Sequence, residues 1–255
     1  MAEYEYDAPV STLLSLRAPE DEPWRDFREL GLSEDDIPAL IRLATDTRLW
    51  EADPGATDAS WAPYHACRAL GQLRATTAVG PLLDLLAERD DDDYLLYDLP
   101  IILAMIGPSA IPLLATYAKD DSVSLYARTT ATGALARMAM AFPEHRQSCL
   151  EGAMDPLTSF AENDPTLNAF LILSLLDMVA VEALPLIEQA YAADAVDAFV
   201  LDWDSVNTKL GTDLPDPSPH REPVHTHVAV PRRESRDRAK KAKRNQAKKS
   251  RRRNR

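Results

Sequence analysis

A short helix signature, a proline followed within two residues by Leu, recurs five times along the chain. The copies begin at Pro38, Pro81, Pro112, Pro156 and Pro185, at intervals of 43, 31, 44 and 29 residues. Self-similarity at such a period is typical of stacked helical hairpins, because one hairpin cannot bury its apolar face alone. The signature therefore predicts an all-α chain folded as an α-solenoid of about four to five hairpins.

Composition divides the 255 residues into four segments. We expect an N-terminal cap at 1–32, the α-solenoid at 33–210, a proline-rich linker at 211–231 and a basic tail at 232–255. The linker holds five prolines, which favour extended backbone. The tail has no aromatic or large aliphatic side chain, so it cannot bury enough apolar surface to fold and is expected to be disordered.

Within 33–210 the apolar spacing predicts a first helix that opens with a capping box at Ser33–Asp36 and continues to Leu49. Four helix pairs follow. They are expected at 61–73 with 77–87, 94–106 with 109–119, 122–141 with 144–160, and 166–178 with 181–193. Ser109 and Asp164 are expected N-caps, and Pro165 suits the first helical position.

The stretch 99–118 carries no charge and has the length of a membrane span. Gly107-Pro108 interrupts it where the repeat places a turn, so two buried helices are the preferred interpretation. Cys67 and Cys149 are not paired by spacing, and the acidic amino terminus shows no apolar signal segment. These features predict a cytoplasmic protein without a membrane span.

The net charge of −13 combines two opposed parts. Residues 232–255 hold 14 Lys and Arg against 2 acidic residues, and the remaining positions hold 14 basic against 39 acidic residues, a net −25. The basic side chains are expected to bind a polyanion. They are Arg232, Arg233, Arg236, Arg238, Lys240, Lys241, Lys243, Arg244, Lys248, Lys249, Arg251, Arg252, Arg253 and Arg255. RNA, DNA or the ribosome, anionic lipid, an acidic protein, the chain's own body, a solubilising role and nuclear targeting remain open as explanations.

No pattern in the sequence assigns a catalytic, cofactor or metal site. Asp90–Asp93 lacks the alternating ligands and central Gly of a calcium loop and is interpreted as a solvated turn. His225 and His227 lie in the linker without a carboxylate or thiol partner at useful spacing. His145 and Cys149 are four residues apart on an expected helix, yet nothing supplies an orienting group or an oxyanion donor.

The run from Trp61 to Leu73, with Ala78-Val-Gly-Pro-Leu-Leu-Asp-Leu-Leu after it, resembles HEAT-like repeats of the phycobilisome-lyase type. The stretch from about Asp36 to Gly211 is similar to bacterial armadillo-like helical proteins of unknown function built from such repeats. The resemblance carries packing motifs only, so it implies a fold and no site residues. Bilin attachment, from which the repeat takes its name, does not follow from the repeat alone.

These features together predict a non-enzymatic protein-interaction scaffold with an unknown protein partner and no cofactor. In HEAT-type stacks the second helices line the concave face, which makes exposed charges there the candidate partner-binding residues. They are Asp84, Glu88, Lys119 and Glu188. Two alternatives stay open, an RNA- or ribosome-associated factor acting through the tail and a bilin-lyase-like enzyme or enzyme subunit.

Overall fold

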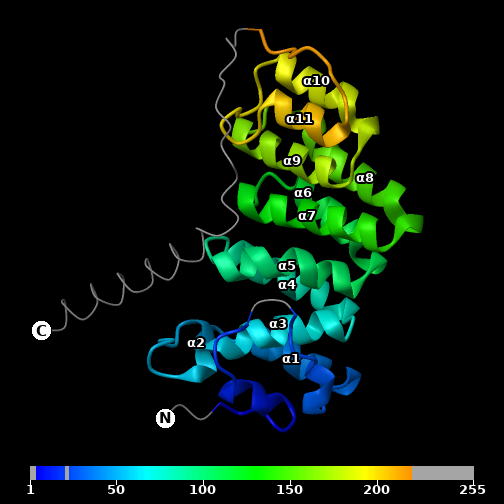
Figure 1. Ribbon diagram of the computed structural model, residues 1–255. Coiled ribbons are helices and arrows are strands. Elements are labelled where there is room, and N and C mark those ends of the chain that lie inside the picture. The colour runs from blue at the N-terminus through cyan, green and yellow to red at the C-terminus, as the bar shows by residue number, and fades with distance from the viewer. Residues whose placement is uncertain (1–3, 21–22, 220–255) are drawn as a thin grey trace, which may run out of the picture. The chain divides into compact units, whose positions relative to one another are not determined.

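The computed structural model describes residues 4–20 and 23–219, which are all-α and contain no strand (Figure 1). Residues up to Pro219 form one compact unit. The predicted basic tail at 232–255 and the linker from His220 onward lie outside the described residues.

The α-helices are α1 (Ile37–Ala44), α2 (Thr47–Trp50), α3 (Ala62–Gln72), α4 (Val79–Glu88), α5 (Asp93–Ile106), α6 (Ile111–Lys119), α7 (Leu125–Ala141), α8 (Arg146–Met154), α9 (Pro165–Asp177), α10 (Leu184–Ala192) and α11 (Trp203–Leu210). Short 3-10 turns connect and precede them: η1 (Val10–Ser15), η2 (Phe27–Leu30), η3 (Glu34–Asp36), η4 (Asp58–Trp61), η5 (Thr76–Ala78), η6 (Pro108–Ala110), η7 (Pro143–His145), η8 (Asp155–Ser159) and η9 (Val181–Ala183). The four predicted helix pairs are confirmed, because α3 with α4, α5 with α6, α7 with α8 and α9 with α10 occupy the expected ranges.

The helices pack in order along the chain. In one row α3 packs between α1 and α5, α5 between α3 and α7, and α7 between α5 and α9. In a second row α6 packs against both α4 and α8. Figure 1 shows successive hairpins side by side, so each helix of the first row is covered by its neighbours in the next hairpin. This arrangement explains why α5 and α9 are apolar on almost every side.

Side-chain caps determine where α5, α7, α9 and α11 begin. Each capping oxygen accepts a backbone N–H of the first turn, a group that has no partner within the helix. The pairs are Asp92 with Leu95, Ser124 with Ala127, Asp164 with Thr166, and Asp202 with Ser205. The predicted cap at Asp164 with Pro165 behind it is therefore confirmed.

Three of the second helices, α4, α6 and α10, begin differently, with a 3-10 turn whose last residue is a buried alanine. The backbone N–H groups of Ala78, Ala110 and Ala183 donate to carbonyls three residues earlier, at 2.9, 3.1 and 3.0 Å. The preceding turns contain Arg74 at φ 53° and Val179 at φ 50°. The same 3-10 turn thus precedes α4, α6 and α10.

Three local predictions are corrected. The first helix does not continue to Leu49: α1 ends at Ala44, because the Asp46 side chain accepts the backbone N–H of Arg48 and starts α2 instead. Ser109 makes no capping hydrogen bond and lies within η6. Pro156 lies in η8 after α8, whereas the proline at the start of that hairpin's second helix is Pro143.

One hydrophobic core runs through the stack from Tyr6 to Leu210. Small residues let neighbouring helices approach closely: a Cβ on Gly71 would lie 3.2 Å from the Ile102 backbone, and one on Gly152 would lie 2.9 Å from the Ala115 Cβ. Larger side chains at these two positions would push adjacent hairpins apart.

Among the described residues no single helix is long and apolar enough to span a bilayer. The uncharged stretch forms α5 and the segment Pro108–Lys119, which meet such a length and composition test only as a pair bent by 110°.

Candidate interaction surface

The four predicted partner-binding residues lie on second-row helices. Asp84 and Glu88 are exposed on α4, Glu188 is half-buried on α10, and Lys119 is exposed at the end of α6. The Lys119 ammonium forms an ion pair with Asp155 at 2.9 Å, so part of its charge is neutralised within the fold. A role of these residues in partner binding remains a prediction.

Tyr117 connects α6 to α4, and the charge of Asp84 affects its pKa. Its hydroxyl donates to the Leu83 carbonyl at 3.0 Å, which links α6 to α4. Burial, with the negative charge of Asp84 next in importance, raises the pKa of Tyr117 to about 12. The phenol therefore stays a neutral hydrogen-bond donor at physiological pH.

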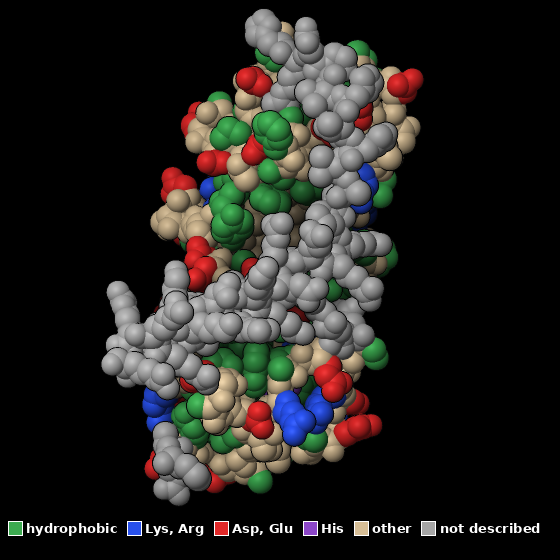
Figure 2. All heavy atoms as spheres, turned by 60° about the vertical axis from the view of Figure 1, so that its left-hand side comes forward, with side chains coloured by type: hydrophobic (Ala, Val, Ile, Leu, Met, Phe, Trp, Pro, Cys, Tyr) green, Lys and Arg blue, Asp and Glu red, His purple; other side chains and the backbone are tan. Residues whose placement is uncertain are grey.

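A second surface is formed by the loops between successive hairpins, which lie along one edge of the stack, on the left in Figure 1. The loops are 89–93, 119–124, 160–165 and 193–204, and they carry four, two, two and four carboxylates. Arg89 and Lys119 are their only basic residues. Figure 2 turns this edge toward the viewer and shows hydrophobic side chains lying next to Asp and Glu side chains. We call it the loop edge.

Two aromatic rings are largely exposed, one in the 193–204 loop and one in the helical turn that directly follows the 119–124 loop, which we include in the loop edge. The Phe199 side chain is fully accessible, with a relative exposure of 104%, and Tyr126, in the first turn of α7, is 50% exposed. α7 packs directly against α9, whose first residue contacts the Phe199 loop. Exposed aromatic side chains of this kind are enriched at protein interfaces.

The loop that carries Phe199 is held by Asp197. The Asp197 backbone N–H donates to the Pro165 carbonyl at 3.1 Å, and its carboxylate accepts the Thr166 hydroxyl at 3.2 Å. The same carboxylate accepts the backbone N–H of Phe199 at 3.0 Å. Phe199 therefore projects from an anchored turn, which lowers the entropic cost of binding a partner there.

Helix capping accounts for part of the acidic character of the loop edge. Asp92, Asp164 and Asp202 cap helices, and Asp120 accepts from the backbone and hydroxyl of Ser122. Capping thus explains part of the acidic composition of these loops but not the exposure of Phe199 and Tyr126.

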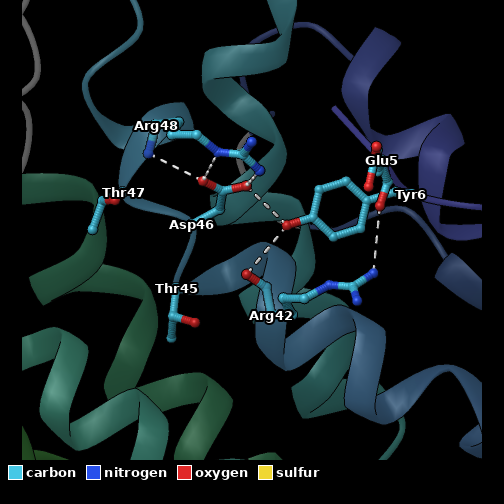
Figure 3. A pocket seen from close by; sticks show the side chains of 7 residues that line it. All are labelled: Glu5, Tyr6, Arg42, Thr45, Asp46, Thr47 and Arg48. Carbon is cyan, nitrogen blue, oxygen red and sulfur yellow. Dashed lines mark hydrogen bonds and ion pairs between the residues drawn. The ribbon is translucent and has the colours of Figure 1, made fainter. Parts of the chain in front are cut away.

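A pocket of about 550 Å³ lies where the N-terminal segment meets α1 and α2, lined by Glu5, Tyr6, Arg42, Thr45, Asp46, Thr47 and Arg48 (Figure 3). The Asp46 carboxylate accepts the Tyr6 hydroxyl at 3.0 Å and two N–H groups of Arg48 at 3.0 and 2.7 Å. The pKa of Asp46 is lowered, mainly by the hydrogen bonds from Arg48. The pKa of Tyr6 is raised to about 12, first by burial and then by the hydrogen bond to the Asp46 carboxylate. The Arg42 guanidinium lies 5.0 Å from the centre of the Tyr6 ring. This arrangement fastens the N-terminal segment to the first helices.

α3 carries a buried polar stripe that sequence reasoning missed. The Arg68 Nε donates to Asp98 of α5 at 2.6 Å, Arg68 Nη1 donates to the Glu20 carbonyl at 2.8 Å, and the guanidinium lies 4.4 Å from the Trp24 ring. Both charged side chains are 4% exposed. The available signal was an Arg and a His within an otherwise apolar helix, both on the face that the N-terminal segment covers.

His65 belongs to the same stripe. Its Nε2 lies 2.8 Å from the Arg17 carbonyl, which makes Nε2 the protonated nitrogen, while Nδ1 is buried without a partner among the described residues. Burial, with nearby Arg68, lowers the pKa of His65 to about 4. Neutral His65 thus holds the N-terminal segment on α3.

Neither cysteine is activated as a nucleophile. Burial raises the pKa of Cys149 to about 11 and raises that of Cys67 further, so neither is a thiolate at neutral pH. No group of three or more His, Cys, Asp or Glu side chains within the described part of the chain is arranged to hold a metal ion. His225, His227 and the fourteen polyanion-binding candidates lie outside the described residues.

Comparisons of this chain with protein-family models, with curated proteins and with solved structures gave no match.

Proposed function

We propose that residues 33–210 form an α-solenoid of HEAT-like hairpins that serves as a non-enzymatic protein-interaction scaffold. The support is the order of packing, in which each hairpin covers the next, together with the recurrent turn before each second helix. A stack of this kind offers long, uninterrupted surfaces to a partner.

The observation that carries the proposal is the exposure of Phe199 and Tyr126 on the loop edge. Burying one large apolar side chain is worth roughly 1.5–3 kcal/mol, so a partner that covers Phe199 would gain a contribution of about this size to its binding free energy. Interface hot spots are often large aromatic side chains, and Phe199 is such a side chain on an anchored turn.

The test compares two double variants of the full chain. Phe199→Ala with Tyr126→Ala removes both rings of the loop edge. The control, Met140→Ala with Val181→Ala, removes side chains that are 58% and 51% exposed, one in the last turn of α7 and one in η9. Quantitative co-purification is expected to show a protein retained by the wild type and the control and lost from the loop-edge variant. Equal retention by all three proteins would contradict the proposal.

A second candidate function is favoured by the charge of residues 232–255, which hold 14 Lys and Arg. We propose that this segment binds RNA or the ribosome through phosphate contacts without sequence preference. If about six side chains meet phosphates, affinity falls by about three decades between about 50 and 200 mM salt. Binding to a homopolymeric RNA that is unchanged after removal of residues 232–255 would refute it.

A further inference from the structure

We infer that residues 16–20 and 23–26 form a displaceable strap over a peptide-binding face of α3, and that an extended peptide segment of a partner protein takes their place. These residues lie between η1 and η2 and have no regular secondary structure. They share no residue with the loop edge, so the inference goes beyond the proposed function and does not depend on it.

Polar side chains on one face of α3 bind the main chain of the strap. His65 and Arg68 are three residues apart, which places them on the same face of the helix. The His65 Nε2 donates to the Arg17 carbonyl and the Arg68 Nη1 to the Glu20 carbonyl, both at 2.8 Å. Two successive contacts on this face are therefore made to backbone oxygens and not to side chains.

Gln72 continues this face and binds the backbone in both directions. Its Nε2 donates to the Arg25 carbonyl at 2.8 Å, and its Oε1 accepts the backbone N–H of Phe27 at 2.9 Å. Main-chain hydrogen bonds of this kind give affinity for an extended peptide, while side-chain contacts give specificity. We therefore assign this face of α3 to peptide recognition, with the strap as its occupant within the chain.

Specificity comes from an aromatic side chain of the strap. The half-buried Trp24 ring lies 4.4 Å from the guanidinium of Arg68, which pairs with Asp98 on α5. Among the described strap residues Pro19 alone is buried. The partner segment that fits is thus an extended one with an aromatic side chain at the place of Trp24.

The strap is weakly held, whereas α3 is not. Most strap residues are exposed, and 17–20 and 23–25 form no backbone-to-backbone hydrogen bond with another described residue. Segments with few buried apolar contacts open at a low free-energy cost. α3 remains packed between α1 and α5, so its polar face persists when the strap leaves.

The polar character of this face also favours exchange over a permanent cap. Replacing a buried ion pair such as Arg68 with Asp98 by apolar residues is often neutral or stabilising, so a simple cap does not require it. The buried His65 Nδ1, without a hydrogen-bond partner in the described chain, is likewise not needed for a cap. Water can replace the hydrogen bonds of these groups, so uncovering them costs less than uncovering an apolar face.

The experiment measures, by fluorescence anisotropy, how a labelled peptide with the sequence of residues 16–30 binds the full chain. The strap competes with this peptide, so the apparent affinity is reduced to the fraction of molecules in which the face is open. Trp24→Ala loosens the strap, and Leu14→Ala, at another half-buried side chain, in η1, is the matched control. We expect Trp24→Ala to bind the peptide about tenfold more tightly than wild type or control, and added Gln72→Met to reverse this gain.

A folded Trp24→Ala chain that binds the peptide no better than the control overturns the inference, as does binding that Gln72→Met leaves unchanged. Limited trypsin digestion of the wild type decides the case in which Trp24→Ala does not fold. Cleavage after Arg17 and Arg25 at a rate independent of urea supports local release of the strap. Cleavage that occurs only with global unfolding contradicts it.

The same peptide titration separates this inference from the proposed function. The Phe199→Ala, Tyr126→Ala variant keeps the strap and α3 intact, so its peptide affinity should equal that of wild type. Loss of a co-purified protein from that variant tests the loop edge alone, and either proposal can fail without the other.

Discussion

Replacing Asp98 by Ala should destabilise the protein far more than removing the whole ion pair. Arg68 and Asp98 are each 4% exposed, so the single change leaves a guanidinium buried without its carboxylate. Breaking a buried pair in this way costs about 3–5 kcal/mol. The Glu20 carbonyl and the Trp24 ring still contact Arg68, so we expect a cost at the lower end, about 3 kcal/mol.

The double variant Arg68→Met with Asp98→Leu removes both charges and keeps most of the volume. Such replacements are often neutral or stabilising, so we expect its free energy of unfolding within about 1 kcal/mol of wild type. Urea unfolding followed by circular dichroism measures both variants. With a slope of about 3 kcal/mol per molar urea, Asp98→Ala should shift the midpoint by about 1 M. Equal destabilisation of the single and double variants would show that the buried, unpaired guanidinium is not what lowers the stability of Asp98→Ala.

Three further outcomes are expected. Val179→Gly should raise the free energy of unfolding, measured by urea titration, by up to about 1 kcal/mol, because a β-branched residue at φ 50° is strained. A loss of stability would contradict this. Gly152→Ala should lower the free energy of unfolding by about 1–3 kcal/mol, and with it the melting temperature, because the new Cβ would lie 2.9 Å from the Ala115 Cβ. An unchanged melting temperature would mean that α6 and α8 can move apart without cost. Because the pKa of His65 is about 4 in the folded chain and 6.5 in its unperturbed state, the unfolded chain binds more protons between these values, and stability should fall as pH falls through that window. His65→Phe should flatten this dependence in urea titrations at several pH values, and a profile that is unchanged would exclude His65 as its source.

Local features of the sequence that act within one turn were predictable. Asp164 followed by Pro165 correctly marked the start of α9, and Gly107-Pro108 correctly marked the turn between α5 and α6. Both signals depend on backbone groups a few residues away, so the surrounding fold does not alter them.

Features that depend on contacts between distant segments were not predictable from local pattern. The apolar spacing continues past Ala44, but α1 ends there. The Asp46 carboxylate that follows accepts the hydroxyl of Tyr6, which lies forty residues earlier in the chain. The Arg68–Asp98 pair joins two helices thirty residues apart, and neither residue has a sequence signal for its partner. The exposure of Phe199 likewise depends on where Asp197 anchors its loop against α9, which spacing alone does not reveal.

A photo-activated cross-linking side chain at position 199 shows whether a partner covers the loop edge. Position 181, in η9 before α10, serves as the matched control. Both native side chains are exposed, so accessibility to the reagent alone does not distinguish them. Under native conditions, we expect position 199 to cross-link to a discrete protein and position 181 not to. Cross-linking that is equal at both positions, or none at position 199, would contradict the loop edge as the interaction surface.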